Sequence, residues 1–396
     1  MKTICVLTLV SIAILFADGH EQKSNNEDKD VDDDRLLLVQ VLFRHGDRTP
    51  AVLYKNDHYD ESQFVEGLGQ LTAYGKARIY RYGKLLRQRY KNYVENLSVR
   101  NVRAQSSPSR RCVESSQLLL AGLFPPKQSW SSSDDDELAR LWQPIAVESV
   151  EKSRAWLLNS EADCPAATQI ENTISEQYPV RQFLSQHYDW IKKLEIYTGQ
   201  NYSSWYDVGY LWDTLLTEKE YFGDKFVRPK WLDIVGNDTW KRLYRFNQME
   251  IGCFDISPKY QRLRGGPFLK EIIFNMATTL GESVDQMNRQ LFTYGSHDTM
   301  ISYIIQALGF WKSIKESPNY GSGLIIELWK DDQHIPQVSL FYANSTNNFD
   351  IYQLHLNESR TFSSQCSMSH CTFDSFKTSL KRFIPTDLES ECTLSY

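Results

Sequence analysis

The sequence lacks the features that mark several common functional classes. Its 396 residues include 44 Lys and Arg against 50 Asp and Glu, which gives a net charge of −6. Nucleic acid is therefore not expected as the main partner, because binding to a phosphate backbone needs a basic surface. The chain has no internal repeat and, beyond its N-terminal segment, no apolar run long enough to span a bilayer. Any anion-binding function must come from a local positive site within an acidic protein.

The N-terminal segment has the pattern of a secretory signal. A basic residue precedes the apolar run Ile4 to Phe16, and small residues follow it. The run is short for a membrane span and suits the apolar core of a cleaved signal peptide, which we assign to residues 1–19. The acidic residues 20–35 have little to bury and are expected to form a disordered leader. The mature protein is therefore expected to be secreted to the extracellular space, without a membrane anchor.

Cysteine usage agrees with export. Of seven cysteines, Cys5 lies in the signal segment, and the even set that is left suits disulfides in an oxidising compartment. A zinc site is the competing interpretation, but the spacings match no zinc pattern, so no metal is expected. The even set is Cys112, Cys164, Cys253, Cys366, Cys371 and Cys392. Five Asn-x-Ser/Thr sequons are candidate glycosylation sites that would have to lie on the surface: Asn96, Asn201, Asn237, Asn344 and Asn357.

A basic motif follows directly on the apolar run Leu36–Phe43, and its sequence is Arg44-His45-Gly46-Asp47-Arg48-Thr49-Pro50. The length and the Leu, Val and Phe content of the run predict a strand buried on both faces, as in a parallel sheet. The motif would then emerge at the carboxyl end of a central strand, where open α/β sheets place their ligand sites. Two guanidinium groups so close together repel each other unless an anion joins them, and phosphate matches the planar fork of arginine. An exposed basic loop is the alternative.

Two further predicted strands end in polar groups. A strand over 99–104 leads through serines and arginines into a helix, whose first turn favours anions. A strand over 290–294 leads into His297 and Asp298. A neighbouring His and Asp in a loop usually form a local hydrogen-bonding pair, but their position after a strand favours a role in the same site. A phosphomonoesterase without a metal needs a nucleophile, cations for the phosphate oxygens and an acid for the leaving group, and these residue types supply all three.

These motifs resemble the histidine acid phosphatases, the phosphatase branch of the histidine phosphatase superfamily. The chain is similar to the prostatic-type and lysosomal-type enzymes and to secreted insect relatives along nearly its whole mature length, and least so between about 170 and 255. The matching strings are Arg44–Pro50, Gly69–Thr72, Ala121–Pro126, Leu141–Pro144, Leu263–Gly266 and Ser296–Thr299. The resemblance implies hydrolysis of small-molecule phosphate monoesters without a cofactor and, at the level of the family, a possible homodimer.

The resemblance also implies a role for each residue of the site. His45 would be the nucleophile and would form a phosphohistidine. Arg44, Arg48 and His297 would bind the phosphate oxygens, and Asp298 would protonate the leaving group. An aspartic acid in water holds its proton only near about pH 4, so activity is expected on the acidic side of neutral.

One further arginine of the family lies at a helix start, in a motif that resembles R-S-T-D-V-D-R-T. The corresponding stretch here is Gln105–Cys112, in which the leading Arg of the motif is Gln105. Arg111 best fits the phosphate-binding place, and Arg110 is a close alternative. Asp47 fits the family motif but is expected to orient the loop rather than to react.

The disulfides implied by the resemblance are Cys164–Cys392 and Cys366–Cys371. The third bridge of the family has no obvious equivalent, which leaves Cys112 and Cys253 as the candidate third pair. Six cysteines allow 15 connectivities, so this third pair is open to test.

The sequence thus predicts an α/β protein with a central mixed sheet flanked by helices. Residues 36–149 and 263–396 are expected to form the catalytic domain, and 150–262 a mostly helical cap insertion over the strand-exit face. The predicted function is secreted, metal-independent acid phosphatase activity on phosphate monoesters. The alternatives are a phytase-like inositol phosphate phosphatase, or a secreted venom or salivary antigen with incidental activity.

Overall fold

The structure is a computed structural model that describes residues 35–133, 137–252, 255, 257–282, 288–314, 316–345, 349–362 and 364–394. The chain divides into two compact units. The α/β unit consists of the described parts of Asp30–Asp47, Leu71–Cys164 and Pro258–Tyr396, and the helical unit of the described parts of Arg48–Gln70 and Pro165–Ser257. The predicted signal peptide and all of the acidic leader except Arg35 lie outside the described residues.

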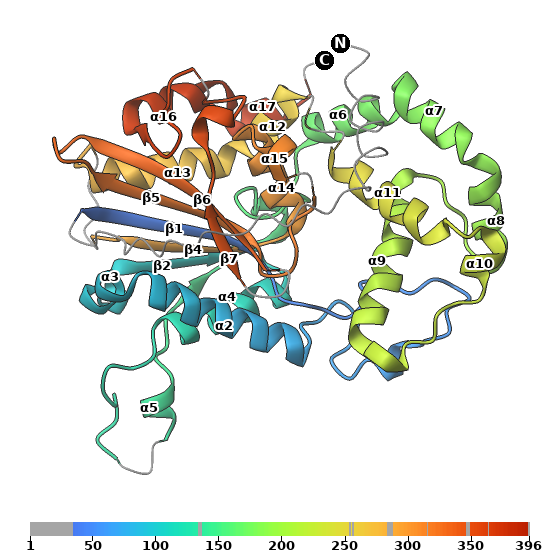
Figure 1. Cartoon of the computed structure of the whole chain (residues 1–396), viewed down its shortest axis with the longest axis horizontal. Coiled ribbons are helices and arrows are strands. Elements are labelled where there is room, and N and C mark those ends of the chain that lie inside the picture. The colour runs from blue at the N-terminus through green and yellow to red at the C-terminus, as the bar shows by residue number, and fades with distance from the viewer. Residues whose placement is uncertain are drawn as a thin grey trace. The chain divides into compact units, whose positions relative to one another are not determined.

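In the described part of the chain, a mixed sheet of eight strands forms the centre of the α/β unit (Figure 1). The strands are β1 (Leu36–Arg44), β2 (Val102–Ser106), β3 (Val147–Glu148), β4 (Leu291–Ser296), β5 (Gly323–Lys330), β6 (Pro336–Asn344), β7 (Asp350–Gln353) and β8 (Cys371–Thr372). Their order is β3-β2-β4-β1-β5-β6-β7, and β8 pairs with β6. The pairs from β3 to β1 are parallel and those from β1 to β7 are antiparallel. The predicted mixed sheet is therefore confirmed.

Helices cover both faces of this sheet. In Figure 1, α2, α3 and α4 lie on one face, and α13 and α14 lie on the other. The helices of the unit are α2 (Ala73–Arg89), α3 (Lys91–Asn96), α4 (Arg110–Leu123), α5 (Leu138–Leu141), α12 (Pro258–Arg264), α13 (Gly266–Thr279), α14 (Asp298–Ala307), α15 (Trp311–Ile314), α16 (Phe373–Leu380) and α17 (Leu388–Cys392). The arrangement buries β4 throughout and β1 at every position except Leu37.

Strand β1 is buried on both faces, as its composition predicts. Val41 and Phe43 belong to the apolar core that β1 forms with α2 and α4. On the opposite face, Nε2 of Gln40 donates a hydrogen bond to the carbonyl oxygen of Ile272 in α13, at 3.0 Å. The strand expected over 99–104 begins later, at Val102, because Val99–Asn101 forms a 3₁₀ turn. The strand ends at Ser106 instead of at the expected residue 104.

The helical unit contains α6 (Pro165–Ser175), α7 (Tyr178–Gln186), α8 (Tyr188–Thr198), α9 (Trp205–Phe222), α10 (Trp231–Val235) and α11 (Thr239–Gly252). Its limits differ from the expected insertion over 150–262. The chain stays in the α/β unit as far as Cys164, because Cys164 is disulfide-bonded to Cys392 in α17. Arg48–Gln70 belongs to the helical unit, where Oγ1 of Thr214 in α9 donates a hydrogen bond to this segment at 2.9 Å. Two described segments therefore build the helical unit.

A buried pair of carboxyl groups lies inside the helical unit. Glu218 of α9 is 0% exposed, and Asp57 lies close enough for its charge to act on the Glu218 carboxyl group. Burial, together with the charge of Asp57, raises the pKa of Glu218 to about 9. Because burial and a neighbouring negative charge both disfavour the carboxylate form, Glu218 retains its proton at neutral pH.

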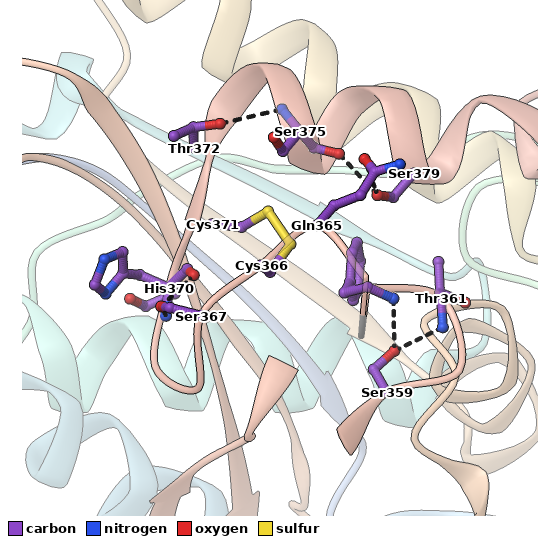
Figure 2. The surroundings of a disulfide bond; sticks show 12 residues. Ser359, Thr361, Gln365, Cys366, Ser367, His370, Cys371, Thr372, Ser375 and Ser379 are labelled. Atoms are coloured by element: carbon purple, nitrogen blue, oxygen red, sulfur yellow. Dashed lines mark hydrogen bonds between the residues drawn. A yellow bond between two sulfur atoms is a disulfide. The ribbon is translucent and has the colours of Figure 1, made fainter. Parts of the chain in front are cut away.

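Both disulfides implied by the family resemblance are present. Cys164–Cys392 ties the chain ahead of α6 to α17, and Cys366–Cys371 closes a loop just before α16. Figure 2 shows the second bridge beside Thr372, whose Oγ1 caps α16 by accepting a hydrogen bond from the N–H of Ser375 at 3.3 Å. The predicted bridge from Cys112 is wrong, because Cys112 is a buried free thiol in α4. Its expected partner, Cys253, lies outside the described residues.

The sequon asparagines are mostly accessible. Asn344 is half-buried on β6, and the other four are exposed: Asn96, Asn201, Asn237 and Asn357. Among the helices that the structure describes, none is both long enough and apolar enough to cross a membrane.

Candidate active site

Three parallel strands bring their polar exits to one edge of the sheet. In the β1–β4 register Arg44 pairs with Ser296, and in the β2–β4 register Ser106 pairs with Gly295. The residues that follow these strands therefore start side by side, at the carboxyl ends where α/β sheets place their ligand sites. Helices α4 and α14 begin at the same edge, and their first-turn N–H groups favour an anion there.

His45 is the residue directly after β1, and it is buried at 2% exposure. Its Nδ1 lies 2.8 Å from the carbonyl oxygen of Gly46, and its Nε2 lies 3.1 Å from Nε of Arg111. A carbonyl oxygen can only accept and a guanidinium can only donate, so Nδ1 carries the proton and Nε2 carries the lone pair. The partners thus select the tautomer in which the lone pair on Nε2 faces Arg111.

The loop after His45 is held tightly against the start of α2. A Cβ on Gly75 would lie 2.2 Å from the carbonyl oxygen of Asp47, so only glycine allows this approach. Thr72 caps α2, since its Oγ1 accepts from the N–H of Gly75 at 3.1 Å and donates to the Asp47 oxygen at 3.2 Å. The Asp47 carboxylate accepts two hydrogen bonds from Arg78, at 2.7 and 3.2 Å. Asp47 is thus engaged in orienting the loop, in line with the sequence.

The two candidate arginines at the start of α4 point in different directions. Arg111 lies against His45 through Nε, and its Nη2 lies 3.5 Å from Nδ1 of His297. Arg110 has a side chain that is 77% exposed and pairs with Glu114 one turn along the helix, at 2.8 Å. The geometry therefore favours Arg111 over Arg110 as the cation of this site.

His297 occupies the N-cap position of α14, and its side chain contacts the loop after β2. Its Nε2 lies 2.8 Å from Oγ of Ser107 and 3.3 Å from Oγ of Ser109. The sequence predicts this loop only as the start of a helix, so the contact of Ser107 with His297, which positions the imidazole, was missed. The run of serines in Gln105–Cys112 was the available signal.

Asp298 forms an ion pair with Arg44. Oδ2 of Asp298 lies 2.9 Å from Nη2 of Arg44, and Oδ1 accepts a hydrogen bond from the N–H of Thr299 at 3.0 Å. The Asp298 side chain is 27% exposed, whereas the side chain of Arg44 is 10% exposed. The carboxyl group is therefore the more accessible member of the pair.

Arg48 belongs to the helical unit. Its Nη2 forms a bidentate pair with both carboxylate oxygens of Asp213 in α9, at 3.0 and 2.9 Å. The Arg48 side chain is 9% exposed and that of Asp213 is 15% exposed. The structure thus groups Arg44, His45, Arg111, His297 and Asp298 in the α/β unit, and describes Arg48 with Asp213 in the helical unit.

A second feature that the sequence did not indicate is the loop before β5. Nη1 of Arg44 donates to the carbonyl oxygen of Pro318 at 2.8 Å, and its Cζ lies 4.0 Å from the ring centroid of Tyr320. The His45 ring lies 5.7 Å from the same ring. No motif marks this segment, so only the fold brings it to the site.

Cys112 lies beside the site without being reactive. Its Sγ donates a hydrogen bond to the carbonyl oxygen of Ser296 at 3.4 Å. Burial raises the pKa of its thiol to about 12, so the thiolate form is not populated at physiological pH.

The described residues contain no group of three or more His, Cys, Asp or Glu side chains that could hold a metal ion.

Comparison with known proteins gives concordant results. The family described as the histidine phosphatase superfamily (branch 2) matches residues 35–351. Prostatic acid phosphatase of Bos taurus is 31% identical over 78% of this chain and 78% of its own length. The same enzyme of Rattus norvegicus is 29% identical over 90% of this chain and 89% of its own length.

Solved structures show the same architecture. The phytase of Hafnia alvei with tartrate has a TM-score of 0.66 at 15% identity, covering 91% of this chain and 99% of that one. The phytase of Citrobacter braakii has a TM-score of 0.65 at 17% identity, covering 91% of this chain and all of that one. At this level of identity the similarity establishes a shared fold, and the predicted fold class is confirmed.

Proposed function

The chain belongs to branch 2 of the histidine phosphatase superfamily and is an acid phosphatase, a hydrolase of phosphate monoesters; from this premise we propose that His45 is its nucleophile and Asp298 its proton donor. The observation that carries the proposal is the pair of hydrogen bonds on the His45 ring. The Gly46 carbonyl oxygen holds the proton on Nδ1, and this leaves the lone pair on Nε2. A nucleophilic imidazole needs this tautomer before it meets the substrate.

The phosphate oxygens would be bound by the surrounding donors. The Nε–H of Arg111 is directed at Nε2 of His45. A phosphate oxygen that accepts this N–H instead would lie next to Nε2, which is then free to face phosphorus. Arg44 and His297 would bind further oxygens, and donors placed in advance stabilise the charge of the transition state. Arg48 is proposed as a phosphate ligand on the strength of the motif alone.

In the first step, Nε2 of His45 attacks phosphorus and forms a P–N bond while the P–O bond to the leaving group breaks. The leaving alkoxide takes the proton of the Asp298 carboxyl group, which becomes a carboxylate. In the second step, water attacks phosphorus as Asp298 accepts one of its protons. The P–N bond then breaks, and the products are phosphate and neutral His45. Asp298 ends the cycle protonated, as it began.

Hydrolysis of p-nitrophenyl phosphate at acidic pH in EDTA tests the nucleophile. His45→Ala is expected to lose on the order of 10³-fold or more in kcat. His355→Ala is the control, because His355 is an exposed histidine of the α/β unit that pairs with Glu358. Rapid acid-free quenching should trap a phosphoprotein that is stable to alkali and labile to acid. Activity that survives His45→Ala, or complete inhibition by EDTA, would contradict the proposal.

The role of Asp298 as the proton donor is tested by comparing substrates with different leaving groups. An alkoxide needs a proton more than p-nitrophenolate does, so Asp298→Asn should slow glycerol phosphate hydrolysis by about 10-fold more than p-nitrophenyl phosphate hydrolysis. An equal loss on both substrates would assign Asp298 to binding instead. Inositol hexakisphosphate in the same assay separates a general phosphomonoesterase, which we propose, from a phytase-like specificity.

We also propose that the enzyme enters the secretory pathway and is released from the cell. The signal-like segment, the two disulfides and the exposed sequons support this route. Expression in an animal cell should give a product in the medium that begins near residue 20 and loses mass on treatment with a peptide-N-glycosidase. Retention of the whole product inside the cell would contradict release.

A further inference from the structure

The guanidinium group of Arg44 is restrained on three sides within the α/β unit. In its plane, Nη1 donates to the Pro318 carbonyl oxygen at 2.8 Å and Nη2 pairs with Asp298 at 2.9 Å. Its Nε is buried and makes no hydrogen bond to the residues that the structure describes. Its Cζ lies over the face of the Tyr320 ring, 4.0 Å from the ring centroid. The ring is therefore a third contact of this guanidinium group, beside its two polar partners.

The loop that carries Tyr320 is itself anchored to the exit of β1. The N–H of Gly321 donates to the carbonyl oxygen of His45 at 3.2 Å, and the N–H of Arg44 donates to that of Ser322 at 2.9 Å. The hydroxyl of Ser345 donates to the carbonyl oxygen of Tyr320. The backbone hydrogen bonds of the two residues that follow Tyr320 thus tie the loop to His45 and Arg44, whose side chains the ring contacts.

Tyr320 is 7% exposed, so its contact with Arg44 is shielded from water. A cation over an aromatic face gains more when both are desolvated, and a planar guanidinium stacks where a lysine ammonium would not. The same ring lies 5.7 Å from the imidazole of His45, tilted by 43°. One aromatic side chain therefore contacts both the proposed nucleophile and a proposed phosphate ligand.

We propose that Tyr320 is a positioning residue, whose ring face sets the guanidinium plane of Arg44 so that Arg44 can bind phosphate and hold Asp298. The inference rests on the proposed function, because it assumes that Arg44 binds the transferred phosphate. The ring face, and not the hydroxyl group, is what the geometry uses. Replacing Tyr320 by Phe should therefore preserve the function, whereas replacing it by an aliphatic side chain should not.

The test compares Tyr320→Phe, Tyr320→Leu and Tyr320→Met in the full chain. With p-nitrophenyl phosphate, the Leu and Met variants should lose about 10-fold in kcat/KM, and inhibition by inorganic phosphate should weaken by a similar factor. The Phe variant should stay within about 2-fold of wild type in both measurements. Tyr80→Leu is the matched control, because Tyr80 is an exposed tyrosine on α2 whose ring has the ammonium group of Lys84 over its face.

A double-mutant cycle separates positioning from packing. Lysine has no plane to orient, so in an Arg44→Lys background the Tyr320→Leu change should add less than about 2-fold. Additive losses in the cycle, an unchanged Tyr320→Leu enzyme, or a Tyr320→Phe variant as poor as Tyr320→Leu would each overturn the inference. If Tyr320→Leu does not fold, the same kinetic measurements on Tyr320→Met test the inference. A wild-type enzyme that forms no phosphohistidine would instead refute the proposed function, and the two failures are thereby distinguished.

Discussion

The Nε–H of Arg111 points at Nε2 of His45 across 3.1 Å, although 66 residues separate the two in the chain. His45 follows β1 and Arg111 lies in the first turn of α4, so the contact exists only because β1, β4 and β2 are parallel neighbours. The same contact places a cation at the atom that we propose attacks phosphorus. The geometry of this region and of the helical unit leads to four predictions.

Removal of the Arg111 side chain should impair the enzyme far more than removal of its neighbour. Arg111→Ala is expected to lower kcat/KM by about 10²- to 10³-fold, because it deletes a donor aimed at the proposed transition state. Arg110→Ala should stay within about 2-fold, since Arg110 is 77% exposed and pairs with Glu114. Steady-state kinetics on an aryl phosphate measure both. Equal losses would show that Arg111 has no special place in the site.

The hydroxyl of Ser107 should matter more than that of Ser109. Ser107 is 0% exposed and lies 2.8 Å from Nε2 of His297, whereas the distance from Ser109 is 3.3 Å. Ser107→Ala leaves the imidazole without its nearer partner and is expected to lower kcat/KM about 10-fold. Ser109→Ala should cost about 3-fold or less. A larger effect at Ser109 would reassign the residue that orients His297.

Breaking the Asp47–Arg78 pair should destabilise the fold. The Asp47 side chain is 11% exposed and that of Arg78 is 13% exposed, so Asp47→Asn leaves a nearly buried guanidinium unpaired. Loss of one partner of such a pair costs about 3 kcal/mol, to be measured as the free energy of unfolding in urea. Glu114→Gln, which breaks an exposed pair on α4, should cost about 0.5 kcal/mol or less. Similar costs for the two would indicate that the Asp47 loop is not fixed by Arg78.

The helical unit should be most stable at acidic pH. The pKa of Glu218 is about 9 in the folded chain against an ordinary value of 4.5, with burial as the main cause and the Asp57 charge as the second. Between these values the folded state retains a proton that the unfolded chain releases, so the free energy of unfolding falls as pH rises. The limit for one group is about 1.4 kcal/mol per pH unit. Tyr54, which faces both carboxyls, has a raised pKa and stays protonated over this range.

Thermal unfolding of the full chain at pH 5, 7 and 8.5 measures this dependence, and Glu218→Gln should flatten it. Glu195→Gln is the matched control. The hydrogen bond from Lys192 lowers the pKa of Glu195, so its contribution is lost as pH falls and leaves the slope above pH 5 unchanged. The same pH slope in wild type and Glu218→Gln would refute the buried proton.

Local features of this protein are determined by the sequence itself. The apolar run that becomes β1, the polar exit motif after it and the Thr72 cap of α2 follow from side-chain hydrophobicity and backbone hydrogen-bonding capacity within a few residues. The sequence also predicts parallel strands, and because the carboxyl ends of parallel strands meet at one edge of a sheet, it predicts that His45, His297 and Asp298 lie close together there. These signals act over short stretches of chain, so they can be recognised in the sequence without knowledge of the packing.

Other features depend on contacts between distant segments, and only the tertiary structure decides them. Arg110 and Arg111 are adjacent on one helix, and the packing of α4 on the sheet determines which of them faces His45. An even count of cysteines suggested a bridge at Cys112, yet the fold leaves it a buried thiol in α4. Tyr320 carries no local signal at all, because its contact with Arg44 spans 276 positions of the chain. Side-chain geometry at such separations is set by how the elements pack, and sequence patterns do not encode it.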